Sequence, residues 1–558
     1  MGDTAILVTV GTPDAVVSLA GAVGRRVASG EAAWSAVEDV VPGVDSVLVV
    51  RDPEQGDPPD VADMLRALAR TSGAGDVPEG DGAPSSRVVE IPVTLDGPDL
   101  AEAARTCTMT ETAFAGQLAG ATLRVALVGF TPGFAYLRGL PAPLDRIARR
   151  ATPRPVVPAG SVAIGGGFAG IYPSATPGGW NLVGRTAFGL FDPGVAPFST
   201  LHLGDRVRLV EVPDAGWPVP RQERAPLRHC GHRPVAVEDP GPLTTVQDAG
   251  RRGVAHLGVP RAGAADPDSR CLANRLLGNP DDAAVLEMTA RGPTLCFGTD
   301  ALVAAVGPAT VEIDDRQLGA GSVVPVSAGQ RLRVGALAGQ SRGVLGVAGG
   351  FEVPALFGSR SSDVLCHLGA GPLRHGDELG LGVAGRARGQ LLPAEQRHPA
   401  LSSGGPERPG SPRTTVLRVI AGPDLLPGEV LRALQETAFA VSPASNRVGV
   451  RLEPDGPPIL AHGHATPEGA ASKGMVTGAV QVPPDGCPVV LLCDHATIGG
   501  YPVPAAVISS DWGTLARAAP GDRVRFAVVS LDDAASARRR AESDRISRVR
   551  GWFPLQAG

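Results

Sequence analysis

Four segments of the chain share one pattern, a short turn followed by a strand of alternating apolar and polar residues. The pattern is clearest in GDRVRLV at Gly204–Val210 and GDRVRFAV at Gly521–Val528, and weaker copies are GQRLRVG at Gly329–Gly335 and GDELGLG at Gly376–Gly382. Successive side chains of a strand point to opposite faces, so each copy has one apolar face for a core. The four copies predict repeated β-units, and the alternative is that Gly-Asp turns recur by chance in a glycine-rich chain.

The composition agrees with a chain of many short strands. Glycine (74) and proline (53) supply 127 of 558 residues, and 43% of the residues are hydrophobic, enough for packed cores. A chain of this length predicts roughly three to five domains. The net charge of −6 argues against a nucleic-acid-binding protein with a broad basic face. No apolar run approaches the length of a membrane span, so we also expect no membrane association.

The N-terminus and the cysteines indicate a cytoplasmic protein. The first residues, MGDTAILVTVG, include Asp3 and no basic segment, and so they do not resemble a signal peptide. The seven cysteines are thinly spread and form no CxxC pair, which is typical of reduced thiols and not of a disulfide framework. Lys473 is the single lysine of the chain.

Changes in pattern divide the chain into seven segments of an α+β, mostly β protein. Strands at 4–10 and 43–51 and helices at 13–28 and 61–70 predict a small α/β domain at the N-terminus. Later segments are short strands separated by glycine and proline, which favours barrels, and two stretches rich in proline are typical of linkers. The predicted segments are 1–90 (α/β domain), 91–215 (barrel), 216–234 (linker), 235–393 (barrel), 394–413 (flexible linker), 414–530 (barrel) and 531–558 (helix or tail).

Two nucleotide or hydrolase motifs occur in the wrong structural context. GGGFAG at Gly165–Gly170 matches a dinucleotide fingerprint, but prolines follow where the required helix would begin. GQSRG at Gly339–Gly343 matches a nucleophile elbow, but strands flank it on both sides, which predicts a hairpin turn. His229–His232 and His462–His464 lack further ligands at a usual spacing, so we predict no metal site.

Five long strings combine polar or ionisable residues with glycines. This combination is typical of places where the backbone approaches a small polar ligand, although any single residue could serve only a turn. The strings are Gly129–Pro141 (GFTPGFAYLRGLP), Val157–Thr186, Thr245–Asn274, Ala444–Leu452 and Ser472–Pro502.

These strings resemble a known enzyme family over nearly the whole chain, from Ile6 to Phe526. The first two are similar to the B subunit of bacterial ATP-dependent 5-oxoprolinase, the allophanate hydrolase subunit 1 type. Those from Thr245 onward are similar to the C subunit of that enzyme, the allophanate hydrolase subunit 2 type. The same pair forms the carboxyltransferase domain of urea amidolyase. The resemblance implies a fusion of a B-like and a C-like half with cyclophilin-like β-barrels, one in the first half and two in the second.

The resemblance also implies the ATP-dependent opening of a lactam or amide. In the implied reaction the γ-phosphate of ATP, with Mg²⁺, activates the amide oxygen, and a separate A-type subunit delivers water. Such a site needs cations for phosphate oxygens and a group that handles protons. The predicted catalytic residues are Asp494, His495, Arg447 and Asp266. The predicted substrate- or nucleotide-binding residues are Asn446, Lys473, Asp248, Tyr501, Arg185, Tyr172, Trp180 and Phe134.

Several positions depart from the family pattern. Phe168 and Ala169 replace a Gln-Thr pair of the B part, and Ala496 and Ile498 replace Gln and Thr in the DHQTTGGYP string of the C part. Lys473 stands where a Glu is usual. A hydrogen-bonding site loses selectivity when such partners are removed, so we expect weak affinity for 5-oxoproline.

Alternative functions remain within this resemblance. They are a diverged member with a new small-molecule reaction, biotin-dependent carboxyl transfer to a urea-like substrate, and a non-catalytic regulator that binds a histidine kinase. For each of the catalytic functions we expect a small-molecule substrate. The expected partners also include a second copy of the chain in a homo-oligomer. We predict that Arg447, Asn446, Asp494 and His495 converge in one cleft of the C-like half, with Asp248 and Asp266 near it.

Overall fold

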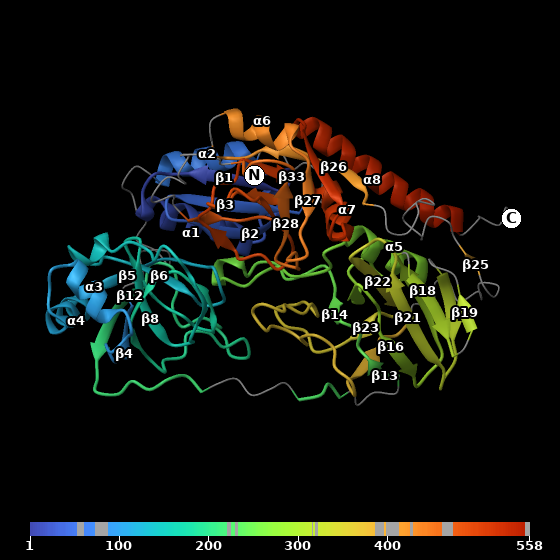
Figure 1. The fold of residues 1–558 in the computed structure, drawn as a ribbon, viewed down its shortest axis with the longest axis horizontal. Helices are drawn as coiled ribbons and strands as arrows, with labels where there is room; N and C mark the ends of the chain where they lie inside the picture. Colours follow the sequence, from blue (N-terminus) through green and yellow to red (C-terminus); the bar gives the residue numbers. More distant parts are fainter. Residues whose placement is uncertain are drawn as a thin grey trace.

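The computed structural model consists of four β-rich bodies (Figure 1). It describes residues 1–52, 61–72, 87–219, 225–228, 233–307, 309–314, 316–318, 322–384, 396–397, 412–424, 428–459 and 472–552. In Figure 1 the first and last bodies lie together at the top, and the two middle bodies lie below them on either side. The predominantly β fold predicted from the sequence is confirmed.

The N-terminal sheet is a three-stranded antiparallel sheet covered by two helices. Its strands β1 (Ala5–Thr9), β2 (Val37–Pro42) and β3 (Ser46–Arg51) have the order β1-β3-β2. The helices are α1 (Pro13–Ala28) and α2 (Val61–Ser72). Helix α1 begins where the Thr12 hydroxyl accepts the Ala15 N–H, because a threonine at this position satisfies a free amide of the first turn.

The second body, here called the B-half sheet, contains seven strands in the order β11-β8-β9-β6-β5-β12-β4. Helices α3 (Leu100–Thr106) and α4 (Glu111–Gly120) accompany it. The GGGFAG motif forms the hairpin between β8 and β9, which confirms that no dinucleotide-binding helix follows it. The strands are β4 (Val88–Val93), β5 (Leu123–Val128), β6 (Ala135–Arg138), β8 (Ser161–Gly165), β9 (Phe168–Ile171), β11 (Asn181–Arg185) and β12 (Arg206–Glu211), and β7 (Arg154–Val157) pairs with β10 (Thr176–Gly178) separately.

The third body, the double sheet, contains two sheets around one core. One has the order β19-β18-β21-β16-β13-β24-β23 and the other β14-β15-β22-β17-β20-β25, and helix α5 (Pro267–Leu277) packs on the second. The GQSRG motif is the turn between β21 and β22, as predicted. The strands are β13 (Pro234–Asp239), β14 (Leu243–Gln247), β15 (Val285–Thr289), β16 (Thr294–Phe297), β17 (Ala301–Val306), β18 (Ala309–Ile313), β19 (Arg316–Leu318), β20 (Ser322–Val326), β21 (Arg331–Leu337), β22 (Arg342–Val347), β23 (Phe351–Glu352), β24 (Glu378–Leu381) and β25 (Gln396–Arg397).

The fourth body, the C-terminal barrel, is closed in the order β26-β33-β30-β31-β28-β27-β34. Its strands are β26 (Thr414–Ala421), β27 (Phe439–Val441), β28 (Gly449–Pro454), β30 (Ala479–Gln481), β31 (Val489–Leu491), β33 (Ala505–Val507) and β34 (Arg523–Val528). The helices are α6 (Gly428–Glu436), α7 (Trp512–Arg517) and α8 (Leu531–Trp552), and β29 (Lys473–Gly474) pairs with β32 (Ile498–Gly499) beside the barrel.

All four predicted turn–strand copies are strands of these bodies. They form β12, β34, β21 and β24, and in β12 and β34 the buried residues alternate with residues that are at least partly accessible. Strand β12 pairs in parallel with β4, and β34 pairs in the same way with β26. The two strong copies therefore occupy the same structural position, the last strand of the body pairing in parallel with its first, whereas β21 pairs with β16 and β18 and β24 pairs antiparallel with β13.

The two ends of the chain share one apolar core, which the sequence analysis did not anticipate. The Val44 amide donates to the carbonyl oxygen of Ser472 at 2.8 Å, so β3 and β29 lie side by side. This core, here called the seam, also includes the aromatic string of the B-half sheet. Its buried members include Ala5, Val41, Leu48, Leu127, Phe134, Tyr136, Tyr172, Trp180, Met475, Ile498 and Val503.

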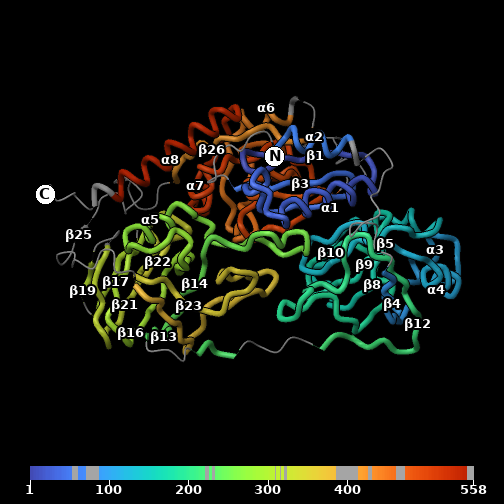
Figure 2. The backbone as a smooth tube through the Cα atoms, turned by 180° about the vertical axis from the view of Figure 1, so that it is seen from behind, coloured from blue at the N-terminus to red at the C-terminus, as the bar shows by residue number. Residues whose placement is uncertain are grey.

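The structure describes only parts of the two predicted linkers, 216–234 and 394–413, and describes the C-terminal helix as far as residue 552. Most of 394–413 lies outside the described residues, but Gln396–Arg397 forms strand β25 against β20. Within 216–234, the Leu227 amide donates to Asp377. The predicted C-terminal helix is present as α8, which packs against α5 on one side (Figures 1 and 2).

Candidate functional site

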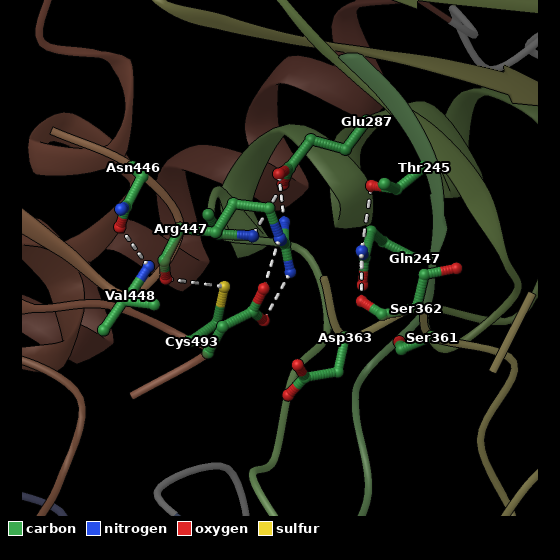
Figure 3. A network of polar contacts seen from close by, with 12 residues as sticks. Thr245, Gln247, Glu287, Ser361, Ser362, Asp363, Asn446, Arg447, Val448 and Cys493 are labelled. Atoms are coloured by element: carbon green, nitrogen blue, oxygen red, sulfur yellow. Dashed lines mark hydrogen bonds and ion pairs between the residues drawn. The ribbon is translucent and has the colours of Figure 1, made fainter. Parts of the chain in front are cut away.

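Arg447 is the centre of a buried ion-pair network between the double sheet and the C-terminal barrel (Figure 3). Its Nε and Nη2 donate to the two carboxylate oxygens of Asp494, at 2.8 and 2.9 Å. Its Nη1 donates to Glu287 on β15, and Nη2 also donates to the carbonyl oxygen of Gly263 at 2.8 Å. We call Arg447, Asp494 and Glu287 the Arg447 clamp, because the guanidinium joins an acid of one body to an acid of the other.

The clamp is buried and pairs one guanidinium with two carboxylates, and the buried Arg342 lies 4.0 Å from Glu287 as a second cation. The side chains of Arg447, Glu287 and Asp494 are exposed by 4%, 2% and 1%. Burial disfavours the charged guanidinium, but Asp494, Cys493 and Glu287 outweigh it and raise the pKa of Arg447 well above its usual range. A buried ion pair offsets the cost of removing its charges from water only when its geometry is good and further hydrogen bonds are made. The bidentate contact between Arg447 and Asp494 provides both.

A local turn aims Arg447 into this position. The Asn446 side-chain oxygen accepts the Val448 amide at 2.8 Å, which closes a turn around Arg447. The Arg447 carbonyl accepts the Asp494 amide at 3.0 Å, and the Cys493 thiol lies 3.8 Å from the same oxygen. Asn446 itself is exposed and points away from the clamp's acids (Figure 3).

Two charged groups beside the clamp are buried without full partners. Asp363 accepts the Cys366 amide at 2.6 Å through Oδ1, and its Oδ2 has no hydrogen-bond partner among the described residues. Burial, followed by the nearby Asp494, raises the pKa of Asp363 to about 6. Arg251 is 1% exposed and donates to the Ser361 carbonyl, but its Nε and Nη1 are unpartnered in the described structure.

Asp248 organises a loop. Its carboxylate accepts the hydroxyls of Ser359 and Ser361 at 2.6 and 2.5 Å and the amides of Arg360 and Gly250 at 2.6 and 2.8 Å. Burial opposes the charge, but these four donors more than compensate and lower the pKa of Asp248. Since the carboxylate is already satisfied, its direct role is to hold 248–250 against 359–361.

Asp266 is the N-cap of helix α5. Its Oδ1 accepts the Ser269 amide at 3.1 Å, as expected for a residue at this position, and its Oδ2 accepts Arg517 Nη1 at 2.6 Å. Asp266 is 1% exposed, so it links α5 to α7 within the protein. These bonds use both of its oxygens.

His495 is buried and has a defined tautomer. The distance from its Nδ1 to the Ala496 carbonyl oxygen is 2.8 Å, and a carbonyl only accepts, so Nδ1 carries the proton and Nε2 is the basic nitrogen. Burial lowers the pKa of His495 below its ordinary value of 6.5. The ring is therefore neutral at pH 7, which suits a proton acceptor.

The other predicted cations are ion-paired elsewhere. Lys473 pairs with Asp424. Arg185, on β11, pairs with Asp96 at 3.0 Å and Asp214 at 2.7 Å. Neither residue belongs to the Arg447 clamp, and a phosphate at either place would have to share or displace these carboxylates.

The predicted aromatic residues pack on one another. Phe134 makes edge-on contacts with Tyr172 and Trp180, with ring centroids 5.0 and 5.5 Å apart. All three are buried in the seam, and burial raises the pKa of Tyr172 to about 12. Tyr501, in contrast, is 43% exposed. Ligand binding by these rings stays a prediction.

The positions that depart from the family pattern lie at or near the seam. A Cβ on Gly129 would stand 2.7 Å from Ile498, so the B-like and C-like strings are in direct contact there. Phe168 stacks edge-on against Tyr136 at 5.7 Å, and Ala169 is completely buried. Ile498 thus fills apolar space between the halves.

A cavity of about 160 Å³ lies next to the clamp. Cys493 and Ala262, Ala264 and Ala265, the residues around the carbonyl that Arg447 binds, form part of its wall. Asp248 and Asp52 also line it, and further wall residues come from α5, from Asp281 and Asp282 after it, from Thr477, from 509–512 and from α8. The cavity is therefore bounded by the N-terminal sheet, the double sheet and the C-terminal barrel together.

The structure thus brings together only part of the predicted set. Arg447 and Asp494 form an ion pair, His495 is the next residue in the chain after Asp494, and Asp248 lines the adjacent cavity. Sequence reasoning missed Glu287, Arg251 and Asp363. An acid inside the apolar strand AVLEMT (284–289) was the available signal for Glu287; the other two had none stronger than their glycine- and serine-rich surroundings.

Two features are absent from the part of the chain that the structure describes. No group of three or more His, Cys, Asp or Glu residues is arranged to hold a metal ion. No helix among the described residues has the length and apolar character needed to cross a membrane. Both predicted histidine motifs, 229–232 and 462–464, lie outside the described residues.

Comparison with family models divides the chain into two matched parts. Residues 1–201 match the carboxyltransferase domain, subdomain C and D, and residues 257–528 match the carboxyltransferase domain, subdomain A and B. The crystal structure of TTHA0988 superposes with a TM-score of 0.79 at 33% identity, covering 94% of this chain and 99% of that one.

Curated relatives match the same two parts. The chain is 34% identical over 312 residues to the C subunit of 5-oxoprolinase from Escherichia coli K12, covering 53% of this chain and 92% of that protein. It is 41% identical over 178 residues to the B subunit of 5-oxoprolinase from Escherichia coli O157:H7, covering 31% and 78%. Similarity to urea amidolyase of Lachancea kluyveri, at 30% identity, spans 54% of this chain but 17% of that protein. The chain therefore belongs to the carboxyltransferase-domain family that includes the B and C subunits of 5-oxoprolinase, and it carries the counterparts of both in one polypeptide.

Proposed function

We propose that this protein is the B–C component of an ATP-dependent 5-oxoprolinase-like enzyme that acts with a separate A-type subunit. The seam carries the proposal, because residues of the B-half sheet, the N-terminal sheet and the C-terminal barrel pack in one apolar core. Two subunits that act on one substrate must keep a fixed geometry, and a shared core in a single chain supplies it.

The chemistry requires activation of an unreactive carbonyl. Amide resonance weakens the electrophile, so phosphorylation of the amide oxygen by ATP converts it into a species that water can attack. His495 is the proposed proton acceptor, since its Nε2 is basic and its ring is held neutral by burial. Arg447 is a positioning residue in this scheme, because Asp494, Glu287 and Gly263 use its donors.

ATP-dependent chemistry implies Mg²⁺ at the phosphates. Mg²⁺ at such a site is held by one or two carboxylates, waters and the phosphates themselves, and among the described residues no group of three or more His, Cys, Asp or Glu side chains marks its place. We therefore assign no protein ligands to Mg²⁺.

The decisive experiment is a coupled ATPase assay with 5-oxoproline, with and without a cognate A-type subunit. We expect ADP release that requires both 5-oxoproline and the A-type subunit. His495→Asn should reduce it by about two to four orders of magnitude, the usual contribution of a general base. His202→Asn is the matched control, because this partly exposed histidine pairs with Asp205 in the B-half sheet, and it should leave turnover unchanged. The proposal is contradicted if the rate of ATP hydrolysis does not depend on 5-oxoproline, or if His495→Asn hydrolyses ATP at the same rate as the unmodified protein.

A second function is carboxyl transfer from biotin to a urea-like substrate. The family-model descriptions and the similarity to urea amidolyase favour it. Its test is transfer of labelled carboxyl from carboxybiotin to urea by the full chain. Transfer without ATP-dependent 5-oxoproline turnover would select this function over the first.

A further inference from the structure

Helix α8 is fixed at its N-terminal end by apolar packing and by a cap. Ala534 and Ala537 are 0% and 5% exposed, and they pack against Ile508, which follows β33 of the C-terminal barrel. The Ser530 hydroxyl accepts the Asp533 amide at 3.1 Å, and the Asp533 carboxylate accepts the Ser530 amide at 3.2 Å. This reciprocal arrangement satisfies free amides of the first turn. The start of α8 is therefore attached firmly to the C-terminal barrel.

The rest of α8 is attached by weaker contacts. Ile546 is 38% exposed, and Val549 packs, partly buried, against the apolar core of α5. Three ion pairs add to this contact, and they join Glu542 to Arg275 at 2.9 Å, Arg545 to Asp268 at 2.8 Å and Arg538 to Asp3 at 3.5 Å. The side chains of Glu542 and Asp268 are 39% and 31% exposed. Ion pairs that are partly open to solvent are weak and are screened by salt.

This weakly attached part of α8 forms one side of the cavity beside the Arg447 clamp. Arg538, Ala541 and Arg545 line that side, and α8 runs along α5 (Figure 2). Cys493 also lines the cavity, but it is only 6% exposed. Its thiol lies 3.8 Å from the carbonyl oxygen of Arg447. The cavity therefore extends from α8 to the residues of the clamp.

We propose that α8 is a flap that pivots at its N-terminal end and opens the cavity, and with it one face of the clamp, to solvent. The pivot is the packing of Ala534 and Ala537, and opening breaks the three ion pairs and the Val549 contact. The family model ends at residue 528, so this control of access belongs to a segment outside the matched domain. The inference goes beyond the proposed function and applies whichever small-molecule reaction the chain catalyses.

Opening of the flap depends on ionic strength. The distance over which charges interact falls from about 10 Å at about 0.1 M salt to about 3 Å at about 1 M. Salt therefore weakens the ion pairs of the moving part, whereas the apolar pivot contains no charge to screen. The open state gains population with salt while the start of the helix stays in place.

The test is alkylation of the full chain by iodoacetamide at constant pH, with the rate at each cysteine followed by mass spectrometry. Burial raises the pKa of the Cys493 thiol well above its ordinary value, so labelling is slow until the cavity opens. We expect labelling of Cys493 to accelerate at least about threefold between about 0.05 M and about 1 M sodium chloride. Cys366 is the internal control, because it is equally buried but does not line the cavity, and its labelling should not accelerate.

Two matched variants separate α8 from the rest of the wall, where salt also weakens the pair of Arg252 and Asp52. Glu542→Arg reverses the charge that faces Arg275 without changing a residue that lines the cavity. It should accelerate labelling of Cys493 about tenfold at low salt, because repulsion replaces attraction. Asp544→Arg makes the same change of charge on the exposed side of the same helix and should leave the rate unchanged.

The salt titration uses the unmodified chain, and so it is decisive even if Glu542→Arg folds poorly. The proposal is overturned if salt does not change the labelling of Cys493 in the unmodified chain. It is also overturned if Cys366 accelerates together with Cys493 there, which would indicate loosening of the whole protein. A third contrary result is an Asp544→Arg variant that accelerates labelling as much as Glu542→Arg does.

Discussion

Replacing Asp363 by asparagine should stabilise the protein in a pH-dependent way. Burial and the neighbouring Asp494 raise its pKa from an ordinary value of 3.8 to about 6. The folded state therefore favours the protonated acid, and its stabilising contribution is fully present below about pH 3.8 and lost as the pH rises to about 6. Above pH 6 the native protein carries a buried charge that asparagine lacks. Asparagine can still accept the Cys366 amide through its side-chain oxygen.

The size of the effect follows from the shift. A displacement of about two pKa units corresponds to about 3 kcal/mol at pH 8, at 1.36 kcal/mol per unit. By the same linkage the advantage of Asp363→Asn should be roughly 1.5 kcal/mol smaller at pH 5. For a body of this size, 3 kcal/mol corresponds to an increase in Tm of roughly 6–12 °C.

Thermal melts of the full chain at pH 5 and pH 8 measure the effect, with Asp248→Asn as the matched control. The pKa of Asp248 is lowered by its four donors, so asparagine there should destabilise the protein at both pH values. An Asp363→Asn variant that melts at the same temperature as the unmodified protein at pH 8, or whose advantage shrinks between pH 5 and pH 8, would refute the reasoning.

Three more predictions follow from the clamp and the seam. Arg447→Met removes the bidentate partner of the buried Asp494 and leaves Glu287 with Arg342 alone, 4.0 Å away, and should cost about 3–5 kcal/mol, seen as a large drop in Tm; a drop no larger than that of a surface arginine variant would argue against the clamp. The lowered pKa of His495 means that stability is lost as the pH falls below about 6.5, and melts of His495→Gln should lack this part of the acid dependence. Ile498→Thr buries a hydroxyl in the seam and should cost about 2–4 kcal/mol, whereas Ile498→Val should cost about 1 kcal/mol; equal melting of the two would show that the seam is loosely packed.

The sequence by itself determined the elements and the family. Helix α1 begins and ends at the predicted residues, and the four turn–strand copies are strands, because both depend on local periodicity and on turn residues. The sequence also predicted that GGGFAG and GQSRG are not functional motifs, because prolines follow the first and strands flank the second. Arg447 and Asp494 were identified through the strings that contain them.

Only the tertiary structure decided which of these residues meet. Glu287 contacts Arg447 across 160 positions of the chain, and β3 lies beside β29 although they are separated by more than 400 residues. No periodicity encodes such contacts, since they depend on how the four bodies pack. The same packing gives Arg447, Lys473 and Arg185 their carboxylate partners. Charge is visible in a sequence, but whether an opposite charge compensates it within 4 Å is a property of the folded chain alone.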